Sequence, residues 1–321
     1  MKYVGLQEQI TSNNRKSIFL LLGFPGILLG ALYAVLMVLT YDEYYGGIDT
    51  QLTNEMFIET IPYVFIGTGI WFAIAYWGHS AMIDYASGSK TIERKSNMRV
   101  YNLTENLCMG VGMKMPKLKI IETNALNAFA SGLNEKNYSV TLTRGIIDTL
   151  DDDELEGVIA HELMHIRNND VRLLVISIIF VGIFSLIINV AFRSILFGGM
   201  TNSRRKDGKG NGGLMLVILV VSVVAYLISL LFKFALSRKR EFMADAGAAE
   251  MTKRPLALAN ALRKISGNSK VDSVKSDDVK EMFIDNSPDA DETSTNLLGG
   301  IGNLFSTHPP IKDRISVLEQ F

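Results

Sequence analysis

The sequence is poor in the features that mark several large classes of protein. It has one cysteine, Cys108, in 321 residues, which excludes an intrachain disulfide framework and fits a reducing compartment. It has almost no net charge, −1 at pH 7. This argues against a nucleic-acid partner, because binding to nucleic acid draws on an excess of Lys and Arg. It also has no internal repeats.

What the chain does have is an unusual balance of apolar and charged residues. Its mean hydropathy is +0.21, which is high for a soluble protein of this length. Yet 20% of its residues are charged, which is too many for a purely transmembrane bundle. The composition therefore predicts an integral membrane protein with a water-exposed part, and a lipid bilayer as one partner.

The apolar residues are concentrated in four runs without Asp, Glu, Lys or Arg, at 17–40, 61–83, 173–192 and 214–232. A transmembrane helix needs roughly 20 residues, so each run predicts a membrane-spanning helix. The first run is longer than the apolar core of a cleaved signal peptide and contains Pro25. We therefore interpret it as a retained anchor.

Flanking charge predicts the orientation of the spans. Lys2, Arg15 and Lys16 precede the first span, the next loop has acids and no Lys or Arg, and a basic cluster follows the second span. We therefore expect a cytoplasmic amino terminus. The loop between the third and fourth spans is also basic, which conflicts with two full crossings. Because both runs are long and uncharged, we expect a hairpin that crosses twice rather than one that dips in without crossing.

Outside the runs, the pattern predicts a mostly helical domain with a small sheet. Asp151 and Glu154 form a capping-box pattern that predicts the start of a helix over 152–169. The expected strands are 117–121, 127–131 and 138–143. The other expected helices are 233–249, 255–265 and one from 309 or 310 onward. A mobile loop is expected over 267–299, with one short helix near 279–284.

The motif that carries chemistry is His161-Glu162-Leu-Met-His165 in the helix 152–169. Residues four apart lie on one face of a helix, so both imidazoles can bind one metal ion while Glu162 can reach a metal-bound water. The opposite stripe of the same helix is apolar and predicts the buried face. The alternative is a chance match, which the capped helical context disfavours.

A catalytic zinc site needs a third protein ligand. The extended metzincin pattern requires a glycine at position 168 and a histidine at position 171, where this chain has Asn168 and Val171, so that class is excluded. Glu241 is a candidate carboxylate ligand, although a solvated or ion-paired acid at a helix start is an equally good interpretation. Asp245, four residues on, could hydrogen-bond a ligating histidine.

At this point the chain resembles the HtpX group of membrane-bound zinc metalloproteases, which is related to the CAAX prenyl proteases. The resemblance extends over nearly the whole chain. It rests on NAFASG at 127–132, AHELMHIRNND at 160–170, REFMADAGAA at 240–249 and STHPPIKDRI at 306–315.

The resemblance implies a cytoplasmic gluzincin-type α+β protease domain in an inner-membrane protein with four transmembrane helices. It implies one zinc ion per chain, bound by His161, His165 and Glu241, with Glu162 as the catalytic residue. It also places the late HPP segment near the active site, which implicates His308 and Arg314. Membrane proteins and misfolded chains are the implied substrates, so the implied role is in protein quality control.

Several roles follow from this expectation. Glu162 would accept a proton from the attacking water, and His308 or Arg314 would act as a second electrophile. The structural alternatives are that His308 caps the final helix and that Arg314 pairs on its surface. Asn127, Ala128 and Phe129 would bind an extended substrate along an edge strand, although Asn127 could equally serve as a turn or cap residue.

The expected domain organisation has four parts. They are a membrane anchor at 1–86, the first half of the protease domain at 87–172, the membrane hairpin at 173–232 and the second half of the protease domain at 233–321. Two other functions remain open at this stage. One is a CAAX-type prenyl-peptide protease. The other is a non-catalytic membrane scaffold with a structural zinc site, for which Glu162 would have no use.

Overall fold

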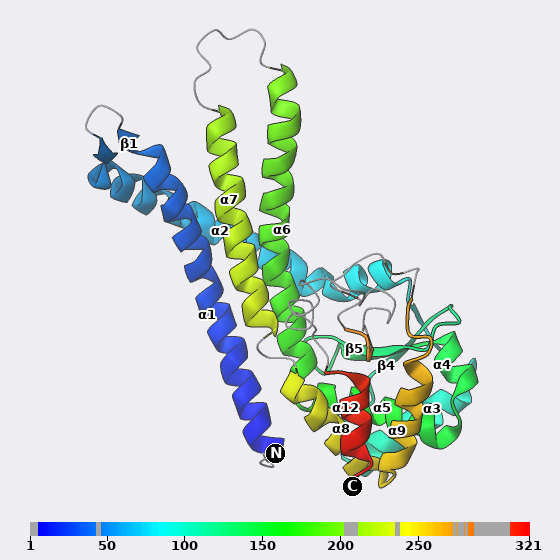
Figure 1. Cartoon of the computed structure of the whole chain (residues 1–321). Coiled ribbons are helices and arrows are strands. Elements are labelled where there is room, and N and C mark those ends of the chain that lie inside the picture. Colours follow the sequence, from blue (N-terminus) through cyan, green and yellow to red (C-terminus); the bar gives the residue numbers. More distant parts are fainter. Residues whose placement is uncertain are drawn as a thin grey trace. The chain divides into compact units, whose positions relative to one another are not determined.

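The structure is a computed structural model that describes residues 6–42, 46–201, 211–234, 238–271, 274, 279, 282–285 and 309–321. The chain divides into two compact units, and Figure 1 follows it through both. Unit 1 consists of Met1–Lys16, Gly78–Val175 and Lys233–Phe321. Unit 2 consists of Ser17–Trp77 and Ile176–Phe232.

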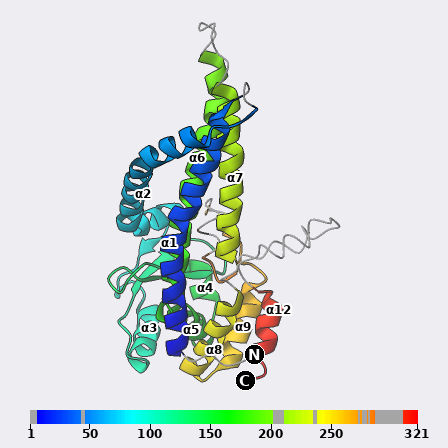
Figure 2. The same ribbon diagram turned by 90° about the vertical axis from the view of Figure 1, so that its left-hand side faces the viewer.

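Unit 2 is built from long apolar helices. They belong to α1 (Leu6–Leu39), α2 (Thr50–Ser87), α6 (Asp170–Thr201) and α7 (Asn211–Phe234), with a two-stranded ribbon of β1 (Tyr41–Asp42) and β2 (Gly47–Ile48). Helices α6 and α7 lie side by side in both views (Figures 1 and 2). Aromatic contacts join the other helices. Phe24 of α1 stacks on Phe180 of α6 with ring centroids 4.2 Å apart, and Trp71 of α2 donates from Nε1 to the Ile179 carbonyl at 3.0 Å.

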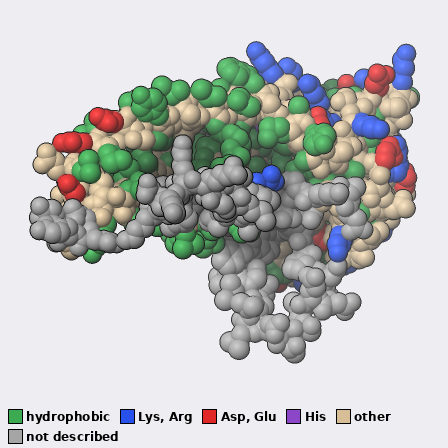
Figure 3. Space-filling model, turned by 90° about the horizontal axis from the view of Figure 1, so that it is seen from above, with side chains coloured by type: hydrophobic (Ala, Val, Ile, Leu, Met, Phe, Trp, Pro, Cys, Tyr) green, Lys and Arg blue, Asp and Glu red, His purple; other side chains and the backbone are tan. Residues whose placement is uncertain are grey.

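Within the described residues, three helices are long and apolar enough to cross a membrane. The qualifying stretches are Leu22–Leu39, Thr50–Ser87 and Asp170–Val190. Large apolar side chains are exposed along α2, among them Phe65, Ile70 and Trp77, and Figure 3 shows apolar side chains gathered over the left part of the visible surface. The fourth expected span corresponds to α7, in which the described apolar stretch is the shorter Leu216–Ile228. The number four therefore stays a prediction.

Unit 1 contains a mixed four-stranded sheet with the order β3-β4-β6-β5. The strands are β3 (Lys90–Thr91), β4 (Lys117–Ile121), β5 (Ala128–Ser131) and β6 (Ser139–Thr143). Strands β4 and β6 are parallel, and the other two pairs are antiparallel. Strand β5 is an edge strand, which agrees with the prediction. It returns to β6 through a turn at Gly132, whose φ of +121° and nearest neighbour, the Asn137 carbonyl oxygen, leave no room for a Cβ.

In the part of the chain that the structure describes, unit 1 also contains six shorter helices. They are α3 (Met98–Gly110), α4 (Arg144–Thr149), α5 (Asp152–Arg167), α8 (Arg238–Thr252), α9 (Pro255–Ile265) and α12 (Ile311–Leu318). Helix α5 is central, because it contacts α3, α8, α9 and strand β5. Its predicted capping box is present: Glu154 N–H donates to Asp151 Oδ1 at 2.9 Å and Asp151 N–H donates to Glu154 Oε2 at 3.0 Å. Leu155, Ile159 and Leu163 are completely buried, which confirms the apolar stripe.

The sequence did not predict β3, α3 or α4. Helix α5 ends two residues earlier than predicted, because Asn169 has a φ of 60°. This left-handed conformation cannot continue a helix, and asparagine tolerates it better than most residues. Helix α6 then starts at Asp170. Most of the predicted loop 267–299 lies outside the described residues.

Candidate metal centre

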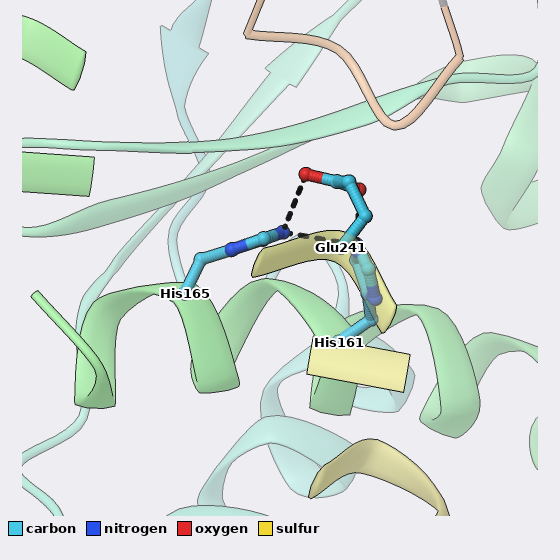
Figure 4. Close-up of side chains that lie close together, drawn as sticks. All are labelled: His161, His165 and Glu241. Atoms are coloured by element: carbon cyan, nitrogen blue, oxygen red, sulfur yellow. Dashed lines mark hydrogen bonds and ion pairs between the residues drawn. The ribbon is translucent and has the colours of Figure 1, made fainter. Parts of the chain in front are cut away.

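Helix α5 presents two histidines on one face. His161 and His165 are four residues apart, about one helical turn. Their Nε2 atoms lie 3.1 Å apart, and their ring planes are nearly perpendicular at 89°. Figure 4 shows the two rings converging on the same side of the helix. The sequence spacing therefore has the geometric result that was predicted from it.

Helix α8 brings Glu241 to this pair. Its Oε2 lies 3.6 Å from His161 Nε2, and its Oε1 lies 3.5 Å from His165 Nε2. Figure 4 shows the carboxylate reaching over from α8 toward both rings. Helix α8 can supply this residue because it packs along α5. The ligand atoms of the three side chains all lie within 4.8 Å of one another.

The three side chains fit a zinc ion. Two imidazole nitrogens and a carboxylate oxygen are common zinc ligands, and ligands about 2.1 Å from a tetrahedral ion are roughly 3.4 Å apart. The three observed separations, 3.1, 3.5 and 3.6 Å, bracket that value. The surroundings of His161 also stabilise a positive charge at this site. Burial and the charge of Arg314 disfavour protonated His161, but hydrogen bonds with Asp245 and Glu241 outweigh them and raise the pKa of His161 to about 9.

Each histidine is held from behind by a carboxylate. His161 Nδ1 lies 2.9 Å from Asp245 Oδ1, and His165 Nδ1 lies 3.2 Å from Asp170 Oδ2. A carboxylate at Nδ1 sets the orientation and tautomer of an imidazole and directs Nε2 toward a metal. Asp170 is a residue that sequence reasoning missed. Its signal was its position five residues after His165, at the first residue of α6.

Arg314 of α12 is completely buried. Its Nε and Nη2 donate to the two carboxylate oxygens of Asp245 at 2.9 and 2.7 Å. Its Nη1 lies 3.5 Å from Glu241 Oε2 and donates to the Ile284 carbonyl at 3.0 Å. The interpretation of Arg314 as a surface pairing residue is therefore wrong, because α12 packs against α8 and α9 and turns this side chain inward.

Burial and charge act in opposite directions on the two acids beside the histidines. Burial raises the pKa of Asp245, but the charge of Arg314 and hydrogen bonds from His161 and Arg314 outweigh it and lower that pKa to about 2. Glu162 is only 2% exposed. Its burial raises the pKa of its carboxyl, and the charges of His161 and His165 offset this only in part. Asp245 is therefore a fixed anion, whereas Glu162 holds a proton more readily than an exposed glutamate does.

The expected substrate strand lies against α5 and is itself buried. Asn127, Ala128 and Phe129 are each no more than 1% exposed. Asn127 Nδ2 donates to the carbonyls of Ser269 and Asp285, both at 2.8 Å. Asn127 thus joins backbone segments that are far apart in the sequence, which is a structural role. His308 lies outside the described residues.

A helix with HExxH whose two histidines meet a glutamate from a second helix is the arrangement of a gluzincin-type metallopeptidase. The chain belongs to Peptidase family M48, whose profile matches residues 94–321. It is therefore a metalloprotease, and the expected resemblance to the HtpX group is confirmed. Family membership also weighs against the non-catalytic scaffold.

Relatives match the chain over nearly its full length. A "Protease HtpX homolog" of Bacteroides fragilis (strain YCH46) is 50% identical over 327 residues, which cover 100% of both chains. A protein of the same description from Dictyoglomus thermophilum is 34% identical over 315 residues, covering 98% of this chain and 94% of the relative. Among solved structures, Ste24p of S. mikatae matches with a TM-score of 0.47 and 16% identity, covering 98% of this chain and 67% of that one.

Proposed function

We propose that this protein is a zinc-dependent endopeptidase that cleaves membrane proteins and misfolded polypeptides on the cytoplasmic side of the cell inner membrane. The observation that carries the proposal is the cluster of His161, His165 and Glu241, whose ligand atoms lie at zinc-like separations beside the buried Glu162. The quality-control role is supported by the full-length similarity to relatives described as HtpX homologues. A chain with both apolar spans and a protease site meets its substrates at the bilayer.

The residues divide the chemistry among them. His161, His165 and Glu241 would hold one zinc ion, which when bound polarises a carbonyl and lowers the pKa of water to about 7. The Glu162 carboxylate would accept a proton from the attacking water and pass it to the leaving amine. Burial of Glu162 keeps competing solvent away from that proton. The net reaction is hydrolysis of one peptide bond.

The surrounding charged residues maintain this arrangement. Asp245 and Asp170 would hold His161 and His165 by their Nδ1 atoms, so that both Nε2 atoms face the ion. Arg314 would act chiefly by positioning Asp245, because both of its bonds to that carboxylate are shorter than 3 Å. A role for His308 as electrophile stays a prediction.

Removal of the metal tests the function directly. The full chain, purified in detergent, should cleave a denatured membrane protein. Treatment with 1,10-phenanthroline should abolish cleavage, and added zinc should restore it, because the residues that remain cannot polarise the scissile carbonyl on their own. Cleavage confined to a prenylated carboxyl-terminal peptide would instead support the CAAX-type activity. Failure of the zinc-loaded protein to cut any polypeptide would refute the proposal.

We also propose the four-part organisation 1–86, 87–172, 173–232 and 233–321, with a membrane hairpin that crosses twice. His165 and Glu241 must meet at one ion, so the chain between them makes an even number of crossings. A cysteine in place of Arg205 should then react from outside intact cells with a membrane-impermeant maleimide. A cysteine in place of the exposed Ser96 should react only after permeabilisation.

The native cysteine will not obscure this experiment. Cys108 is 2% exposed, and burial raises the pKa of its thiol to about 11, so that little reactive thiolate is present at neutral pH. If the two introduced cysteines instead react alike, both in intact cells or both only after permeabilisation, the hairpin does not cross the bilayer.

A further inference from the structure

The outer side of edge strand β5 is occupied by a segment of the same chain, residues 282–285. Ile284 donates its backbone N–H to the Ala128 carbonyl oxygen at 2.8 Å. On the other side of β5, the Asn127 carbonyl accepts from Thr143 N–H at 3.0 Å. Because neighbouring carbonyls of a strand point in opposite directions, the Ile284 bond lies where an added β-strand would bind.

Side chains on both sides of this bond extend the contact. Asn127 Nδ2 donates to the Asp285 carbonyl at 2.8 Å, and Asp285 N–H lies 3.4 Å from Asn127 Oδ1. The ring of Phe283 meets the ring of Phe129 edge-on, with centroids 5.2 Å apart. Asn127, Ala128 and Phe129 therefore each contact one residue of the segment. These are the same three residues that were expected to bind substrate.

The segment also reaches the metal centre. The Ile284 carbonyl accepts from Arg314 Nη1 at 3.0 Å, and the same nitrogen lies 3.5 Å from Glu241 Oε2. The backbone N–H of Ile284 is thus bound by the edge strand, and its carbonyl is linked to a candidate zinc ligand through one guanidinium nitrogen. Phe283 and Ile284 are 2% and 1% exposed, so the segment fills its position and a peptide substrate cannot share it.

We propose that residues 282–285 are an internal pseudosubstrate, and that a substrate binds by replacing them in the same backbone register. This inference rests on the proposed function and deepens it, because the segment indicates the substrate class. The site would take an extended peptide with an aromatic or large apolar side chain against Phe129. Backbone groups would pair with Ala128 and Asn127, and a carbonyl would accept from Arg314. The protein is then self-inhibited until a polypeptide displaces the segment.

A matched pair of variants at one position tests the proposal. Ile284→Ala and Ile284→Pro both remove the isoleucine side chain, but only proline lacks the N–H that binds Ala128. Loss of this one hydrogen bond should weaken the segment's binding to β5, relative to that of a competing substrate, by roughly 2- to 12-fold. We therefore expect KM for a fluorogenic peptide to be lower by that factor in Ile284→Pro than in Ile284→Ala, with equal zinc content.

A second measurement does not depend on the folding of a variant. A synthetic peptide with the sequence of residues 279–287 should inhibit the wild-type protein competitively. The same peptide with Phe283→Ala should inhibit more weakly, because it loses the contact with Phe129. If neither peptide competes and the two variants share one KM, the pseudosubstrate is refuted while wild-type cleavage continues. If the zinc-loaded wild-type protein cleaves nothing, it is the proposed function that fails.

Discussion

Replacing Glu162 by glutamine should lower kcat for peptide cleavage by about 10²- to 10⁴-fold. Glutamine is nearly the same size as glutamate, but its amide cannot accept the proton from the attacking water. His161, His165 and Glu241 are unchanged, so the variant should still bind one zinc ion per chain. Cleavage of a fluorogenic peptide and metal content by atomic absorption are the two measurements.

The matched control is Glu156→Gln, the same chemical change on the same helix. Glu156 lies near the start of α5 and pairs loosely with Arg254 at 4.0 Å, with its side chain 23% exposed. The control should keep its activity within about a factor of two, since a surface ion pair contributes little. Normal cleavage by a zinc-loaded Glu162→Gln protein would show that another residue is the base.

Replacing Arg314 by methionine should destabilise the protease unit by about 3–5 kcal/mol, because it leaves buried charge uncompensated. Asp245 would lose two charge-assisted hydrogen bonds, and Glu241 would lose the guanidinium nitrogen that lies 3.5 Å from its Oε2. The thermal midpoint of the full chain in detergent should fall sharply. Activity should fall as well, because Asp245 no longer holds His161 in a defined orientation.

Two comparison variants separate this effect from the loss of any arginine. Arg263 pairs with Glu319 at an exposed position, with the two side chains 44% and 47% exposed. Arg263→Met should therefore cost no more than about 1 kcal/mol. Adding Asp245→Asn to Arg314→Met removes the uncompensated anion and should recover part of the lost stability. Equal thermal midpoints for Arg314→Met and Arg263→Met would contradict the buried-network interpretation.

The features that were predictable from the sequence are those with a local cause. The capping box at Asp151 and Glu154 predicted the start of helix α5. The four-residue spacing predicted that His161 and His165 lie on one face of that helix. The β-rich stretch 138–143 predicted strand β6, and the turn that begins at Gly132 predicted a shorter strand before it, which is β5. The long apolar runs likewise required only a count of consecutive residues, which is why three of them correspond to span-length helices.

Other features depend on contacts between distant segments. Chemistry at the residue level left Glu241 undecided between a ligand and a surface acid, and only the resemblance favoured the ligand. The packing of α8 along α5 places its carboxylate 3.5 and 3.6 Å from the two imidazoles. The sequence also left two locations possible for Arg314, the active site and the protein surface. Arg314 is buried because it lies on the inward-facing side of α12. Helix α12 is separated from α5 by well over a hundred residues, so this packing could not be predicted from a local pattern.

The sequence by itself determined that this chain has membrane-span-length helices, a metal-binding helix and a glutamate beside the ligands. Each of these features depends only on residues within a single stretch of the chain. Only the tertiary structure decided what surrounds them. It placed Asp170 behind His165, Arg314 against Asp245, and residues 282–285 on the edge of β5. The physical reason is that burial removes water as a partner, so each buried charge or backbone group must find its partner wherever packing brings one.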